Sequence, residues 1–222
     1  MLTKERYIQF SIVLAANANN PTILNPDFLK YNNIVDNSWE LLNQPICTPP
    51  ISQVFFKNNV SIVSQLDKIV FGVDLENNDS IKFEDIQRIV REYIKTIPHV
   101  EYTGIGINPR YVIELSPDET ANKYILENFI HINSFSSQLL GLGFVIKFSL
   151  REHTTCNLNI DTGRTGVPNK IREAIVIKAN FHHEIKPNVA TKLHEMNKVI
   201  NSFRDDISFF EKEIIKKLFH KG

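Results

Sequence analysis

The sequence predicts an α+β fold, in which a mainly antiparallel sheet carries about three substantial helices, including a long amphipathic helix at the carboxyl end. Two observations predict this class. Segments of alternating apolar and polar residues, typical of strands, follow one another through links too short for a parallel crossover. Three other segments carry apolar residues at helical spacing. We expect residues 1–222 to form a single domain, because no stretch has the composition of a flexible linker.

The first strand is predicted over residues 7–15, where apolar and polar side chains alternate. Residues 17–50 differ, because they contain five prolines and many asparagines together with large apolar residues. We expect this stretch to be an ordered excursion that Phe28 and Trp39 pin to the body of the protein. Loops of this length are often functional, but packing against the body explains the apolar residues equally well.

The middle of the chain alternates between predicted strands and two helices. The turn residues Asn58–Asn59 and Asp67 separate three strands of a meander. A helix over 83–97 is ended by Pro98, and a second helix is predicted from a capping box at 116–119 to about residue 130. The predicted strands are 53–57, 60–65, 68–75, 100–115, 144–151, 155–161 and 174–183.

The terminal helix is predicted over residues 188–219, with Asn188 as its N-cap. Its apolar residues recur in steps of four and three: Val189, Leu193, Met196, Ile200, Phe203, Ile207, Phe210 and Ile214. The helix either lies across its own sheet alone or also pairs with a second copy of the chain. In the second case we expect Phe209, Ile215 and Phe219, which lie outside this stripe, to form the interface. A break near 204–206 is the alternative to one continuous helix.

The composition argues against several classes of protein. The chain has 25 basic and 25 acidic residues, and a nucleic-acid-binding protein would usually have a basic excess. Cys47 and Cys156 lie far apart, which fits a reducing cytosol and provides no metal-binding framework. No signal peptide is recognisable and no apolar run is long enough to span a membrane. We therefore expect a cytoplasmic protein that binds neither membranes nor nucleic acids.

No motif provides a coherent catalytic site. The glycines at 104–106 and 141–143 do not form a dinucleotide fingerprint, since Pro109 and Ile146 occupy the position of the third glycine. The Asp161-Thr162-Gly163 sequence resembles that of dimeric aspartic proteases, but the residues around it indicate an ordinary hairpin. No nucleophile elbow, HExxH motif or P-loop is present. We therefore predict no catalytic residue, no metal ligand and no cofactor.

The histidines provide an alternative catalytic site. His182 and His183 are adjacent on a predicted strand, so their side chains should point to opposite faces. If the last two strands pair symmetrically about residues 167 and 168, His182 lies opposite His153. A metal-dependent hydrolase that uses these histidines with Glu152 or Glu184 is then conceivable.

Two stretches resemble a sporadically distributed family of uncharacterised prokaryotic α+β proteins. One stretch is 102–111, on a predicted strand, and the other is 193–203, at the start of the terminal helix. The resemblance covers about a tenth of the chain. It implies a single α+β unit with a closing helix, and the patchy occurrence of the family resembles that of defence-linked or mobile genes. It implies no activity and no site residues.

The sequence favours a non-catalytic protein-interaction or assembly module that associates with itself or with another protein through the terminal helix. The observations behind this hypothesis are the helix, the 17–50 excursion, the neutral charge and the lack of a catalytic set. The alternatives are the metal-dependent hydrolase and a small-molecule sensor with a pocket between sheet and helices.

Overall fold

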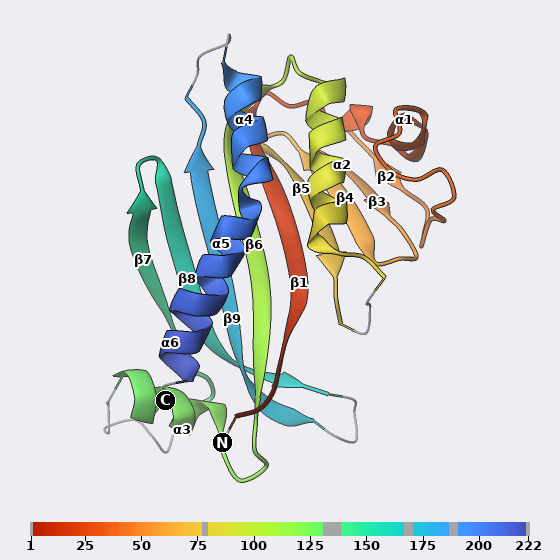
Figure 1. The fold of residues 1–222 in the computed structure, drawn as a ribbon. Coiled ribbons are helices and arrows are strands. Elements are labelled where there is room, and N and C mark those ends of the chain that lie inside the picture. Colours follow the sequence, from red (N-terminus) through yellow and green to blue (C-terminus); the bar gives the residue numbers. More distant parts are fainter. Residues whose placement is uncertain (1, 77–79, 131–138, 167–170, 187–190, 221–222) are drawn as a thin grey trace.

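The computed structural model describes residues 2–76, 80–130, 139–166, 171–186 and 191–220. One nine-stranded sheet with the order β2-β3-β4-β5-β1-β6-β9-β8-β7 forms the body (Figure 1). Every pair of neighbouring strands is antiparallel. The α+β class predicted from the short links is therefore confirmed. The strands are β1 Leu2–Asn17, β2 Ile46–Cys47, β3 Ile51–Phe55, β4 Val60–Gln65, β5 Lys68–Asp74, β6 Glu101–Leu115, β7 Gly143–Arg151, β8 Thr154–Thr165 and β9 Arg172–Glu184.

The two longest strands, β1 and β6, lie side by side at the centre of the sheet. Their pairing runs from Leu2 opposite Leu115 to Asn17 opposite Glu101. β1 therefore begins five residues before the predicted start. The residues that precede position 7 are mostly polar and show no apolar alternation, but the far end of β6 supplies a partner for their backbone groups.

The helices cover one face of the sheet (Figure 1). α2 Phe83–Thr96 and the terminal helical segments lie across it, and α3 Ala121–Ile125 with the π-helical turn η2 Leu126–Ile130 lies at its lower end. The predicted capping box at Ser116 is wrong. Thr120 is the N-cap instead, because its side chain accepts a hydrogen bond from the Lys123 N–H. No described helix is long and apolar enough to cross a membrane.

The 17–50 excursion packs against the body. It contains the 3-10 turn η1 Pro21–Ile23, the short helix α1 Pro26–Tyr31 and strand β2. The ring of Phe28 meets Tyr93 of α2 at 6.1 Å between centroids, and Trp39 meets Phe56 at 5.3 Å. These aromatic contacts attach the excursion to the helix and to the sheet.

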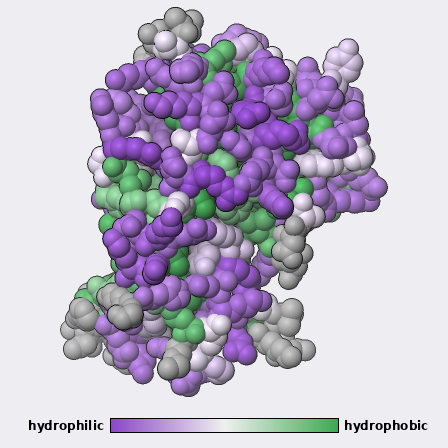
Figure 2. Space-filling view, viewed as in Figure 1, coloured by the Kyte–Doolittle hydropathy of each residue, from purple (hydrophilic) through white to green (hydrophobic). Residues whose placement is uncertain are grey.

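The apolar core lies between the sheet and the helices. On β1 the buried side chains Phe10, Ile12 and Leu14 face the helices, while the alternate residues point to the opposite face. The outer surface of the helical layer is mainly hydrophilic, with apolar patches between the helices (Figure 2). The core is therefore one-sided, and none of the described helices lies on the second face of the sheet.

The terminal helix is long and amphipathic, but it is interrupted at Ser202. Its segments are α4 Lys192–Asn201, α5 Phe203–Phe209, the π-helical turn η3 Phe210–Ile215 and α6 Lys216–Phe219. Ser202 departs from helical geometry and its hydroxyl donates to the Val199 carbonyl, a bond that competes with the helix ladder. The prediction of one continuous helix is thus wrong. The break falls at Ser202, two residues before the alternative break predicted near 204–206.

Most of the predicted apolar stripe is buried. Met196, Ile200, Phe203, Ile207, Phe210 and Ile214 lie in the core. Leu193 is an exception, because 37% of its surface is exposed. Val189 and the predicted cap Asn188 lie outside the described residues.

We predict that Ile200→Ala destabilises the protein by about 2–5 kcal/mol, because it opens a cavity where the side chain is fully buried. Leu193→Ala in the same helix is the matched control, and its cost should stay below about 1 kcal/mol. Urea unfolding followed by circular dichroism measures both values. Equal losses for the two variants would contradict the described packing of α4.

Candidate functional site

The face of the sheet opposite the helices presents a field of polar side chains. The strand register brings them together, since Gln9 lies opposite Arg110, Arg110 opposite Lys178, and Lys178 opposite Asn159. These residues are half-buried or exposed, in contrast to the buried residues between them. The polar set on the five strands β1, β6, β9, β8 and β7 comprises Gln9, Ser11, Asn108, Arg110, Asn157, Asn159, Lys178, Asn180, His182, Lys147 and Ser149. We call this set the open face.

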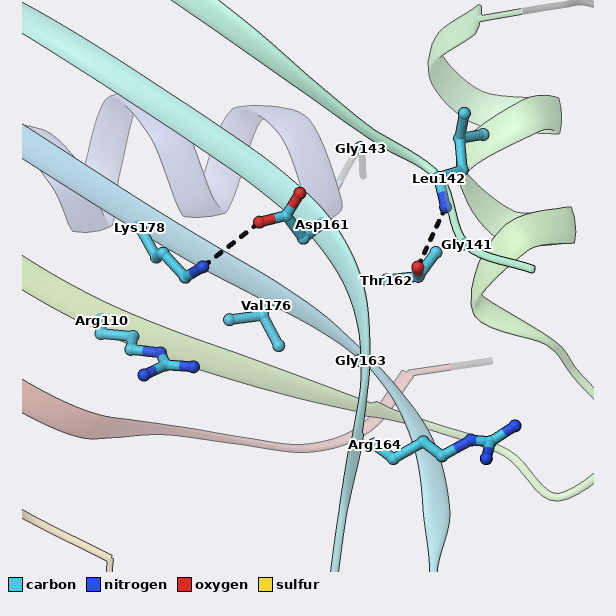
Figure 3. A pocket seen from close by; sticks show the side chains of 10 residues that line it. All are labelled: Arg110, Gly141, Leu142, Gly143, Asp161, Thr162, Gly163, Arg164, Val176 and Lys178. Atoms are coloured by element: carbon cyan, nitrogen blue, oxygen red, sulfur yellow. Dashed lines mark hydrogen bonds and ion pairs between the residues drawn. The ribbon is translucent and has the colours of Figure 1, made fainter. Parts of the chain in front are cut away.

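Three adjoining hollows of about 500, 300 and 400 Å³ lie along the open face, and Arg110 lines all of them. The largest is also lined by Asp161, Arg164 and Lys178, with Thr162 at its border (Figure 3). Asp161, Thr162 and Gly163 form part of the strand β8 beside this hollow. This agrees with the prediction that the sequence belongs to an ordinary hairpin. The hollows make Arg110 the centre of the open face.

Two glycines shape the largest hollow because no side chain fits at their positions. A Cβ atom on Gly143 would lie 2.1 Å from Oδ1 of Asp161, and one on Gly163 would lie 2.5 Å from Cγ2 of Val176. Both distances are far below a normal contact. A side chain at either position would therefore have to displace Asp161 or Val176, which line the hollow.

Arg110 is the cation of the largest hollow that has no partner among the described residues. Its Nε atom is buried and has no hydrogen-bond acceptor, and no described carboxylate forms an ion pair with it. Its neighbours are paired: the Lys178 ammonium lies 3.3 Å from Asp161, and Arg164 Nε donates to Glu173 at 3.0 Å. Like charges directly opposite each other on neighbouring strands are unfavourable. The Arg110–Lys178 pair therefore places two cations side by side, and only Lys178 has a carboxylate partner among the described residues.

The histidines predicted as an alternative site do not converge. His182 is exposed on the open face and His183 is 5% exposed beneath the helices, so the two side chains point to opposite faces as predicted. The predicted pairing of His182 with His153 is wrong by two residues, because Thr155 lies opposite His182. The residues near 167 and 168, about which that pairing was centred, lie outside the described residues.

His153 instead occupies the turn between β7 and β8, in the left-handed region with φ 59°. Its ring nitrogens lie 3.0 Å from a Glu152 oxygen and 3.8 Å from a Glu184 oxygen. Within the described part of the chain, no group of three or more His, Cys, Asp or Glu side chains is arranged to hold a metal ion.

His183 belongs to a buried hydrogen-bond network that the sequence did not reveal. Its Nδ1 lies 3.2 Å from the Thr154 hydroxyl and its Nε2 lies 2.7 Å from a carboxylate oxygen of Asp206. Arg151 donates to the other oxygen of Asp206 at 2.5 Å. Asp206 is 1% exposed and lies on α5, whereas its partners Arg151 and His183 come from β7 and β9. The network therefore ties the terminal helix to the sheet.

Thr154, His183 and Asp206 follow one another in the order of a catalytic nucleophile, base and acid. Their surroundings nevertheless favour a structural role. The residue that would supply the nucleophile, Thr154, is 5% exposed, and the Asp206 carboxylate is shared with Arg151. The nearby thiol of Cys156 is also inert, because burial and then the charge of Asp206 raise its pKa to about 12.

The three predicted interface residues make contacts within their own chain. Phe209 packs against Phe148 and Phe181, and Phe219 lies 5.5 Å from the Phe129 ring of η2. Ile215 and Phe219 are buried by these elements. They leave little surface for a second copy, and self-association through these residues stays a prediction.

Comparison with known protein families and with functionally characterised protein sequences finds no match. The resemblance of 102–111 and 193–203 to a prokaryotic family therefore stays a prediction. In the structure, the first of these stretches lies on β6 and carries Asn108 and Arg110 of the open face. The second stretch contains most of α4.

We predict that Asp206→Ala destabilises the protein by about 1–3 kcal/mol, because it leaves the buried ring of His183 without its partner and removes the ion pair of the half-exposed Arg151. The neighbouring exposed residue provides the control: Asp205→Ala should change stability by less than about 0.5 kcal/mol. Chemical unfolding of both variants tests this. A loss at Asp206 as small as that at Asp205 would show that the network does not hold α5.

Proposed function

We propose that this protein is a non-catalytic interaction module that binds a protein partner on the open face of its sheet. The single observation that carries the proposal is the one-sided core. Helices cover one face of a nine-stranded sheet, while the other presents amides, hydroxyls and cations at half-buried positions. The terminal helix then has a different role from the one expected, because it closes the core and leaves the opposite face for recognition.

The size of the open face supports a protein partner. The five strands of the open face, at a spacing of about 4.8 Å, make a surface roughly 24 Å wide. The shortest of them, β7, has nine residues, so at roughly 3.3 Å per residue the face covers about 700 Å². A specific protein–protein interface buries about 800 Å² on each partner.

The chemistry of the open face supports the same class of partner. Asparagine and glutamine side chains carry two donors and a two-fold acceptor, so they can pair with the peptide groups and polar side chains of another protein. Gln9, Asn108, Asn157, Asn159 and Asn180 lie on four adjacent strands. Exposed Val145 on β7 adds apolar area beside these amides. A polar surface with little apolar area is typical of a non-obligate interface, from which the partner dissociates.

The hydrolase alternative receives less support from the geometry. His182 and His183 lie on opposite sides of the sheet, and the His183 side chain is occupied by Thr154 and Asp206. His153 does lie beside Glu152 and Glu184 at a hollow of about 230 Å³, but within the described residues no group of three such side chains is arranged to hold a metal ion.

Site-specific photocrosslinking in the source cells tests the proposal. A photoreactive phenylalanine analogue at Asn157 lies on the open face, and one at Lys212 on exposed helical surface serves as the control. We expect a discrete protein adduct from position 157 and none from position 212. Adding unlabelled protein to the lysate should suppress the adduct, whereas adding an Asn180→Arg variant should not. Adducts from position 212 alone, or from neither position, would contradict the proposal.

A further inference from the structure

We propose that Arg110 is a carboxylate-binding site, and that the ligand of the open face presents a single acidic side chain or a chain-terminal carboxylate to it. This inference rests on the proposed function, which identifies the carboxylate as part of a protein. The site itself rests on the surroundings of Arg110.

The Arg110 guanidinium has free hydrogen-bonding capacity. A guanidinium carries five N–H donors in a planar fork that matches the two oxygens of a carboxylate. No hydrogen bond or ion pair with a described residue engages this guanidinium, and its Nε is buried without an acceptor, so a ligand in the hollows would meet its terminal nitrogens. The side chain also lines all three hollows, so a ligand entering any of them meets the same cation.

The charge balance around Arg110 favours a monoanion. The other cations of the largest hollow are already matched, Lys178 by Asp161 and Arg164 by Glu173. One positive charge therefore remains, on Arg110. Asp161 and Asp74 also line the hollows that Arg110 shares. Their negative charges would repel a phosphate dianion more strongly than a carboxylate of unit charge.

Neutral amide side chains surround the Arg110 cation. Gln9 lies opposite Arg110 on β1, and Asn108, Asn159 and Asn180 line the hollow of about 400 Å³ beside it. These neutral amides bring donors and acceptors but no additional charge. The arrangement suits a carboxylate attached to a polypeptide whose backbone pairs with the amides, rather than a highly charged polymer such as a nucleic acid.

The test follows the Nε–H resonance of Arg110 by two-dimensional NMR while anions are added to the full-length protein. The probes are sodium acetate, a blocked pentapeptide with a central glutamate, its glutamine analogue, inorganic phosphate and sodium chloride. We expect saturable shifts with acetate and with the glutamate peptide. The glutamine peptide should bind at least about tenfold more weakly, because a charge-assisted bidentate pair is lost. Phosphate and chloride should cause only small shifts without saturation.

Three variants serve as controls, with binding measured at backbone amides of β6 and β9. Arg110→Gln should abolish the response to the glutamate peptide. Arg110→Lys should weaken it several-fold, since it keeps the charge but loses the fork. Arg164→Gln lines the same hollow and should leave the response unchanged, because Arg164 already pairs with Glu173. Unchanged thermal unfolding of Arg110→Gln would show that a lost response is not a lost fold.

The outcomes separate the site from the proposed function. Saturable acetate binding without any crosslinked protein at position 157 would support the carboxylate site and assign it to a small acid, while the proposed function fails. Tighter binding of the glutamate peptide than of acetate would support both. Saturable phosphate binding stronger than that of acetate, or no response to any carboxylate, would overturn the inference even if a protein crosslinks to the open face.

Discussion

The packing of the helices on one face of the sheet is the constraint on which the rest of this structure depends. It divides every central strand into two sets of alternate residues, one apolar and one polar. On β1, Phe10, Ile12 and Leu14 meet the helices, while Gln9 and Ser11 face away. The buried bonds from Asp206 to His183 and Arg151 hold the terminal helix in this layer. A helical layer on only one side leaves the other side of the sheet for recognition.

The fold could be predicted largely from the sequence because its signals are local. Alternation over two residues identified the strands, and the turn at Asn58–Asn59 fixed the meander of β3 and β4. Helical spacing and Pro98 located α2 to within a residue. The errors arose where tertiary contacts override local preference. The polar start of β1 is a strand only because β6 extends beside it. Ser202 interrupts the terminal helix because its hydroxyl bonds to the Val199 carbonyl of the preceding turn.

The candidate site could not be predicted because it depends on the register of distant strands. Gln9, Arg110 and Lys178 are far apart in the sequence, and only the β1–β6 and β6–β9 pairings place them side by side. For Asp206 the sequence indicates only a position in the terminal helix or in its alternative break at 204–206, because nothing local shows that His183 lies beneath it. The one available signal was that polar residues alternate regularly along β1, β8 and β9. This regularity indicates a solvent-facing side of a sheet, but it does not indicate which residues on that side lack a partner.

The central claim is that the face around Arg110 is accessible in the free protein. NMR line broadening by a neutral soluble gadolinium chelate tests it directly, with the side-chain amides of Asn157 and Asn180 as probes and the buried amide of Asn19 as the internal reference. The account predicts strong broadening of the two open-face amides and little of Asn19. Open-face amides that stay as sharp as Asn19 would show that another part of the chain or a second copy covers this face, and would contradict the account.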